Sequence, residues 1–138
     1  MQDARAGRLS QALASVRVQR RLKPRDAEAA WLLGVLLRES GDHEQSVHHL
    51  RQAVEMAPNN PLVHRALAES LMWVRRFPDA LEAWRRATEL DPSNGDAWLE
   101  RTTALLITAD VRAGAEVAAE GLRHHPDWPP LVRDRKST

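Results

Sequence analysis

The side chains best suited to chemistry in this chain are six histidines, because the sequence contains no cysteine. Four of them form the adjacent pairs His48-His49 and His124-His125, and neighbours on a helix point in different directions. No carboxylate completes a recognisable zinc-ligand spacing around them. The sequence also lacks a glycine-rich phosphate loop, a G-x-S-x-G nucleophile elbow and an H-E-x-x-H segment. We therefore expect no enzyme activity, no catalytic residue, no metal site and no bound cofactor.

Proline recurs along the chain at a constant interval, at Pro24, Pro58, Pro92 and Pro126, and we call this interval the repeat period. A period of roughly 20 to 50 residues is typical of a chain built from stacked copies of one small unit. We therefore expect three full units at 27–60, 61–94 and 95–128. An N-terminal half unit or capping helix precedes them at 1–26, and residues 129–138 form a C-terminal tail or the start of a further helix.

Apolar residues within these units recur at helical spacing. In residues 79–90, Ala80, Trp84 and Ala87 share one helix face, and charged residues fill the other. Proline and glycine stand between such segments, where proline ends the preceding helix. No segment alternates apolar and polar residues as a half-buried strand does. We expect an all-α fold with helices over 8–22, 27–39, 43–56, 61–74, 78–90, 96–107 and 111–124, followed by a frayed end.

Small and apolar residues recur in step with the prolines. The first unit contains Leu33-Gly34, Ser46, Leu50, Ala53 and Pro58. The second contains Leu67-Ala68, Leu71, Ala80, Trp84, Ala87 and Pro92. The third keeps Trp98, Leu105 and Pro126 but departs at Arg101, Thr102, Ala118 and Gly121. Over residues 7–128 this pattern resembles the tetratricopeptide repeat (TPR) family. The resemblance implies a TPR-type α–α superhelix, or solenoid, with about three full repeats and an N-terminal half repeat.

In that family the first helix of each repeat lines a concave groove that holds a protein or peptide partner. Carried over position by position, the resemblance implies a groove lined by Trp31, Val35, Arg38, Arg65, Glu69, Met72, Trp73, Leu99, Thr103 and Leu106. Two interpretations of the tryptophans stay open. Trp31 and Trp73 pack along neighbouring helices, as apolar residues at helical spacing usually do. Alternatively, they are anchors for a peptide or helix of the partner.

Some members of the family hold the acidic C-terminus of heat-shock chaperones with a clamp of lysine, arginine and asparagine side chains. The corresponding positions here hold Trp31, Val35, Ala66, Asp96 and Glu100. None of these is a cation, and two are acidic. We therefore expect no chaperone carboxylate clamp and no binding of such tails.

Charge is unevenly distributed along the chain. Residues 1–25 contain seven basic residues and one acidic residue, whereas the other 113 contain 13 basic and 18 acidic residues. The basic helix is either a solvated cap, with cations near its C-terminus, or a surface that meets the acidic body of another copy. Its footprint is small for a nucleic acid or a membrane, so we expect neither nucleic-acid binding nor membrane insertion. The absence of a signal-peptide pattern and of a long apolar run favours a cytoplasmic location.

Three functions are compatible with this sequence. The first is a non-catalytic protein–protein interaction scaffold that binds a peptide or helix in its groove, as a whole protein or as a fragment of a larger one. The second is a self-associating module, a homo-oligomer joined through its terminal edges at residues 8–22 and 122–132. The third is a TPR appendage of a larger transferase enzyme. The first helix stands in the second-helix position of a unit that lacks its first helix, so we expect Ala12, Val16 and Gln19 to face that gap.

Overall fold

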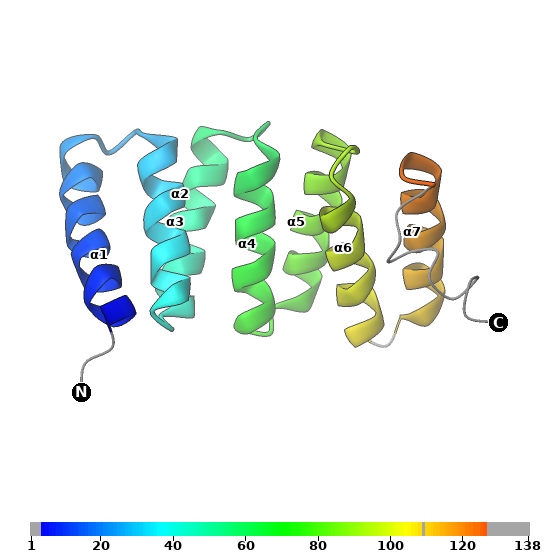
Figure 1. Cartoon of the computed structure of the whole chain (residues 1–138). Helices are drawn as coiled ribbons and strands as arrows, with labels where there is room; N and C mark the ends of the chain where they lie inside the picture. The colour runs from blue at the N-terminus through cyan, green and yellow to red at the C-terminus, as the bar shows by residue number, and fades with distance from the viewer. Residues whose placement is uncertain (1–3, 109, 127–138) are drawn as a thin grey trace.

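The described part of the chain folds entirely into helices and the turns between them. The computed structural model describes residues 4–108 and 110–126, and these residues contain no strand. The helices are α1 (Ala4–Leu22), α2 (Ala27–Glu39), α3 (His43–Met56), α4 (Pro61–Trp73), α5 (Phe77–Leu90), α6 (Gly95–Ile107) and α7 (Val111–His124). Figure 1 shows them side by side in a row that runs from α1 at one end to α7 at the other. The predicted all-α fold is confirmed, and the seven expected helices are all present within residues 4–108 and 110–126.

The predicted boundaries agree with the observed ones for α2, α3 and α7. α1 begins at Ala4 instead of residue 8, because Gly7 continues the helix and does not interrupt it. α4 ends at Trp73, and α5 and α6 begin at Phe77 and Gly95, each one residue from the expected position. The frayed end expected at 129–138 lies outside the described residues.

The helix starts repeat as regularly as the prolines do. Asp26, Asn60 and Asn94 are the N-caps of α2, α4 and α6, and each side-chain oxygen accepts a bond from the first-turn backbone. The second helix of two units is capped in the same way by Asp42 and Asp110. The equivalent residue before α5 makes no such bond, and that helix has a proline in its first turn instead.

The helices form two layers. α2, α4 and α6 make one layer, α1, α3, α5 and α7 make the other, and each helix packs on the next along the chain. α2 also contacts α4 directly, so the first helices of the first two units are neighbours. We call the surface of α2, α4 and α6 that faces away from the other layer the groove face.

The core lies between the two layers. Leu50 and Leu71 are almost completely buried in its central cluster, together with Trp84. A second cluster joins Val16 of α1 to Leu33 and Leu37 of α2. The expectation that Val16 faces the gap left by a missing helix is therefore wrong. It is 4% exposed and attaches α1 to the first full unit.

Two buried hydroxyl groups connect the first unit to the second. The Ser46 hydroxyl donates to the carbonyl oxygen of Gly34 at 2.6 Å, and the two serine oxygen atoms of Ser46 and Ser70 are 2.8 Å apart. Since the single hydroxyl proton of Ser46 is used on Gly34, Ser70 is the donor to Ser46. Both serines are completely buried, so each polar group needs this partner.

The turns between units are fastened by the helix that follows them. His64 Nε2 donates to the carbonyl oxygen of Pro58 at 2.7 Å, and Trp98 Nε1 donates to that of Pro92 at 2.9 Å. His64 and Trp98 are one repeat period apart, as are the two prolines. Two different side chains therefore make the same bond at the same position of successive units.

Arg101 stands in the third unit where the first two have Leu33 and Leu67. Its Nη1 donates to Thr88 Oγ1 at 3.0 Å, and its guanidinium lies 5.7 Å from the centre of the Trp98 ring. Burial lowers the pKa of Arg101, because it opposes the charged form. The charge is thus accommodated by specific neighbours at a position that is apolar in the other units.

Candidate protein-binding groove

All ten residues that the resemblance assigned to a groove lie on the three helices of the groove face. α2 carries Trp31, Val35 and Arg38; α4 carries Arg65, Glu69, Met72 and Trp73; α6 carries Leu99, Thr103 and Leu106. Their environments differ, and they divide into a charged group, an apolar group near the start of the helices and an apolar group near their end.

Four charged side chains form a continuous series across the three helices. Arg38 Nη1 lies 2.7 Å from Glu69 Oε2, and Arg65 Nε lies 3.5 Å from Glu69 Oε1. Arg65 also binds Glu100 through two hydrogen bonds of 3.0 and 3.2 Å. We call Arg38, Glu69, Arg65 and Glu100 the charge ladder. Three of them were expected in the groove, whereas Glu100 was noted only for replacing a clamp cation.

The charge ladder is partly withdrawn from solvent. Burial raises the pKa of Glu69, with Glu100 and Glu39 adding to the shift, although Arg38 and Arg65 oppose it. The hydrogen bonds to Glu100 raise the pKa of Arg65. Arg38 also donates to the backbone oxygen of Ala66 at 3.4 Å. The ladder therefore links α2, α4 and α6 and leaves a polar strip on the groove face.

We expect the Glu69→Gln variant to gain stability relative to the native chain as the pH rises from about 4 to about 6. A carboxyl group whose pKa is higher in the folded state stabilises the fold below its unfolded pKa, and this contribution is lost as the pH rises through the folded pKa. Glutamine does not titrate and avoids that loss. Urea unfolding of both chains across this pH range measures the difference.

Glu82→Gln is the matched control, and its trend should have the opposite sign. The hydrogen bonds from Arg85 lower the pKa of Glu82, so its contribution is present above the unfolded pKa and lost as the pH falls. This variant should therefore lose stability relative to the native chain as the pH rises. Parallel trends for the two variants would contradict the burial argument.

An apolar pocket opens where α2 and α4 begin. Its volume is about 380 Å³, and its lining is Ala27, Glu28, Trp31, Asn60, Leu62 and Val63. Trp31 is half-buried, because one part of its side chain packs against two core clusters and another part forms a wall of the pocket. Leu62 is 53% exposed. The pocket thus combines an aromatic wall with a solvent-accessible leucine.

A related pocket lies one unit further along, between α4 and α6. Its volume is about 280 Å³ and its lining is Asn60, Pro61, Leu62, Arg65, Ala87, Asp91, Asn94 and Ala97. Arg65 stands one repeat period after Trp31, so this pocket has a cation where the first has an aromatic ring. The groove face therefore repeats its shape from unit to unit while its chemistry changes.

Trp73 lies at the other end of α4. Its ring stacks on that of His43, with centroids 4.8 Å apart and planes within 5°, and it remains 66% exposed. Leu106 and Ile107 of α6 are also exposed, by 48% and 62%. Val35 and Met72, in contrast, pack against the central core cluster. Trp31 thus follows the packing interpretation, and Trp73 has the exposure that the anchor interpretation requires.

Leu99 and Thr103 contribute less to this surface. Leu99 is half-buried, and the Thr103 hydroxyl donates to the carbonyl oxygen of Leu99 at 2.8 Å within its own helix. The sequence did not single out Asn60 or Val63, which line the first pocket. Asn60 and Val63 lie one repeat period before Asn94 and Ala97, which line the second pocket. This periodicity is the sequence feature that could have identified them.

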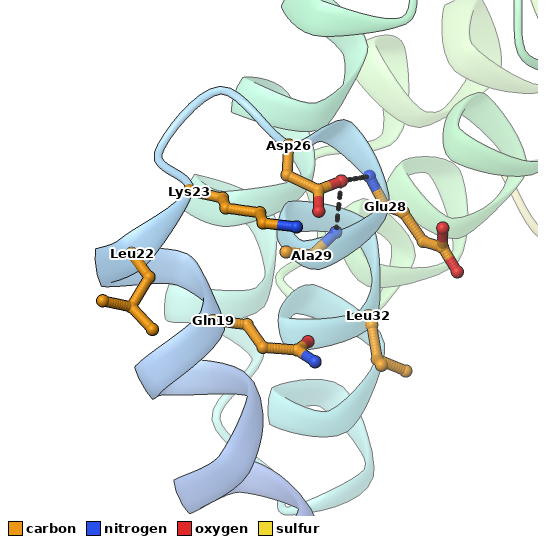
Figure 2. A pocket seen from close by; sticks show the side chains of 7 residues that line it. All are labelled: Gln19, Leu22, Lys23, Asp26, Glu28, Ala29 and Leu32. Carbon is orange, nitrogen blue, oxygen red and sulfur yellow. Dashed lines mark hydrogen bonds between the residues drawn. The ribbon is translucent and has the colours of Figure 1, made fainter.

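A third pocket lies at the N-terminal edge of the array, between α1 and α2. It has a volume of about 290 Å³ and is lined by Gln19, Leu22, Lys23, Asp26, Glu28, Ala29 and Leu32. Figure 2 shows these side chains along α1, the turn and α2, with the Asp26 carboxylate bonded to the backbone nitrogen atoms of Glu28 and Ala29. Leu22 is 76% exposed at this edge. The corresponding C-terminal edge extends beyond the described residues.

The histidines are dispersed over separate contacts. His43 stacks on Trp73, His124 stacks on Trp98, and His64 fastens a turn. Within residues 4–108 and 110–126, no three histidine, aspartate or glutamate side chains are grouped so that they could hold a metal ion. No helix in the same ranges combines the length and apolarity needed to cross a membrane.

Comparisons with known proteins agree with this architecture. Two models of the tetratricopeptide repeat family match residues 3–61 and 37–99, so together they cover the chain from residue 3 to residue 99. Comparison with curated protein sequences gave no match.

Solved structures with the same arrangement of helices include the protein MamA. A crystal structure of MamA superposes with a TM-score of 0.83 at 14% identity, covering 96% of this chain and 80% of MamA. MamA from Desulfovibrio magneticus RS-1, from residue 41 onward, gives 0.79 at 19% identity, with 97% and 72% covered. YrrB, described as a TPR protein with an unusual peptide-binding site, gives 0.70 at 19% identity, with 80% and 57% covered. The repeating prolines, the two helical layers and both family models lead to one conclusion: the chain belongs to the tetratricopeptide repeat family.

Proposed function

We propose that this chain is a non-catalytic scaffold, built from repeats at 27–60, 61–94 and 95–128, that binds a peptide or helix of a partner protein on its groove face. The observation that carries the proposal is the exposure of large apolar side chains on this face. Leu62, Trp73 and Ile107 are each between 53% and 66% exposed, although they belong to the large apolar residues that usually avoid water. A partner that covers them would remove this apolar surface from solvent.

The groove face also offers polar contacts that would orient such a partner. The charge ladder crosses it between the two apolar ends, with ions of both signs held in place. Fixed charges contribute to specificity more than to affinity. YrrB, which shares this fold, is described as having a peptide-binding site, and this supports a peptide as the ligand. No sequence feature supplies catalytic chemistry, and a cytoplasmic setting remains part of this proposal.

The test begins with peptides selected from a random display library on the immobilised native chain. Affinity for a selected peptide is then measured with Leu62→Ala and Trp73→Ala variants, whose exposed side chains can be truncated without opening the core. We expect each variant to lose about tenfold or more in affinity, as for an interface anchor. Val18→Ala, which truncates a 44% exposed residue of α1 in the other layer, is the matched control and should bind as the native chain does. Unchanged binding by both groove variants would refute the proposal.

A second candidate is self-association through the N-terminal edge. It is favoured by the pocket between α1 and α2 and by the exposed Leu22 beside it (Figure 2). A helix from another copy placed there would occupy the position of the absent first helix. Light scattering over a range of concentrations separates the candidates, because growth of the particle mass with concentration indicates assembly and a constant monomer mass indicates a free groove.

A further inference from the structure

A further cavity, separate from the three pockets described above, lies between α1 and α3, in the layer opposite the groove face. It has a volume of about 450 Å³ and is lined by Arg17, Arg20, Arg21, Leu33, His49 and Gln52. Three of these six residues are arginines and none is acidic. We call this surface the α1–α3 cleft.

The arginines of this cleft differ from most others in the described chain. Seven arginines of the later helices and turns form ion pairs with carboxylates: Arg38, Arg51, Arg65, Arg76, Arg85, Arg86 and Arg112. Within the described residues, no carboxylate pairs with Arg17, Arg20 or Arg21. Three positive charges thus converge on one cavity without a counter-charge.

Arg20 is held in place by neutral acceptors. Its Nη2 donates to Gln52 Oε1 at 2.6 Å and its Nη1 donates to the carbonyl oxygen of Pro24 at 2.6 Å. Its Nε atom and His49 Nδ1 are both buried and have no hydrogen-bond partner. The guanidinium and the imidazole therefore keep hydrogen-bonding capacity that no other residue uses.

The pKa of His49 is affected by its burial beside the cleft and by the charges around it. Burial lowers the pKa of His49, and the charges of His48, Arg20 and Arg17 lower it further. Positive charge near the imidazole makes its protonation less favourable.

The cleft is not a general property of the repeat. One unit later, the positions of Arg17, Arg20, Arg21, Leu33, His49 and Gln52 hold Arg51, Val54, Glu55, Leu67, Ala83 and Arg86. Val54 there packs against the central core cluster, and Arg51 is paired with Asp79. The cationic cavity is therefore specific to the junction between α1 and the first full unit.

We propose that the α1–α3 cleft binds a phosphate monoester, with the guanidinium groups of Arg17, Arg20 and Arg21 surrounding the phosphate oxygens. A phosphate group carries close to two negative charges near neutral pH, and arginine binds such oxyanions through paired hydrogen bonds. The cavity is larger than a single phosphate group, and the buried side chain of Leu33 gives it an apolar floor for the organic part of the ester. This site is separate from the groove face and does not depend on the scaffold proposal.

The test is calorimetric titration of the full chain with inorganic phosphate and with glycerol 2-phosphate, at constant ionic strength set by sodium chloride. The Arg17→Gln/Arg21→Gln variant removes two exposed cleft arginines and should bind about tenfold more weakly or not at all. The Arg8→Gln/Arg25→Gln variant is the control, since it removes the same charge from exposed positions outside the cleft and should bind as the native chain does. Equal weakening of both variants would show diffuse attraction and overturn the proposal.

An NMR titration of the histidines gives a second readout that does not depend on affinity. Bound phosphate should raise the pKa of His49, because a nearby anion favours the imidazolium, and it should leave the ring chemical shifts of His64 unchanged. Absence of a His49 response at saturating phosphate would overturn the proposal.

The source of the ester is resolved by comparing glycerol 2-phosphate with a phosphoserine peptide and with the same peptide carrying glutamate. Tighter binding of the phosphopeptide identifies a modified protein as the source, and equal binding of both phosphate compounds identifies a small ester. Equal binding of the glutamate peptide would contradict phosphate recognition.

Discussion

The Leu67→Arg variant should have a free energy of unfolding lower by about 3 to 5 kcal/mol, the usual cost of a buried charge without a partner. Leu67 is 8% exposed and belongs to the central core cluster beneath α4. Arginine at this position would displace apolar contacts and carry its charge into the central core cluster. Urea unfolding followed by circular dichroism measures the effect.

Arg101 shows why the same residue type is tolerated one unit later. There it has the Thr88 hydroxyl, the Trp98 ring and the nearby charge of Glu120. The positions one unit before Thr88, Trp98 and Glu120 hold Val54, His64 and Arg86. Val54 accepts no hydrogen bond where Thr88 accepts one, and Arg86 carries a positive charge where Glu120 carries a negative one.

The reverse substitution, Arg101→Leu, is the matched experiment. We expect it to raise the free energy of unfolding by about 1 kcal/mol, because removing a half-buried charge in favour of apolar contact is often stabilising. Thr88 keeps a partner, since its hydroxyl donates to the carbonyl oxygen of Arg85 at 2.9 Å. A loss of stability in Arg101→Leu would show instead that the contacts of Arg101 stabilise the fold more than apolar contacts of leucine would.

The Gly34→Ala variant should have a free energy of unfolding lower by about 1 to 3 kcal/mol, the cost of overpacking a core. A Cβ atom at Gly34 would lie 2.5 Å from Leu50 Cγ and 2.7 Å from Leu50 Cδ2. Leu50 has no exposed surface, so it cannot move away without disturbing the core around it. The equivalent pair of the second unit is Ala68 and Trp84, and the need for glycine therefore belongs to the first unit alone.

Gly7→Ala is the control for this prediction. Gly7 lies inside α1, and a Cβ atom there would meet nothing within 4 Å. Alanine in a helix interior is more favourable than glycine by about 0.5 to 1 kcal/mol, so this variant should be more stable than the native chain. Opposite signs for the two glycine substitutions would establish that packing against Leu50, and not helix propensity, decides the outcome at Gly34. An equal gain in both would contradict the close approach of α2 and α3.

The periodic part of this structure could be predicted from the sequence, because helices, turns and caps depend on residues close together in the chain. The repeat period placed the helices within a few residues of their observed bounds. The expectation that Val16 faces a missing helix is wrong, because Val16 lies one repeat period before Leu50 and is buried as Leu50 is. The absence of a preceding helix suggested that this side chain is exposed. The structure shows that burial at Val16 follows its position in the repeat.

The finer arrangement of the groove could not be predicted, because it depends on which side chains meet across helices. Glu100 joins the charge ladder because Arg65 reaches from α4 to α6, 35 residues along the chain. Trp73 stacks on His43, a contact between the end of one helix and the start of another. The repeat period places both residues on known helices, but it contains no information on side-chain direction across a unit boundary.

The charge ladder has a consequence for how this array would respond to a charged partner. Glu69 is shared by Arg38 and Arg65, and Arg65 is in turn shared by Glu69 and Glu100. A carboxylate that draws Arg38 away leaves Glu69 dependent on Arg65, and this competes with the hold of Arg65 on Glu100. Neighbouring repeats therefore share one series of ion pairs, and the loss of one pair alters the electrostatic surroundings of the next.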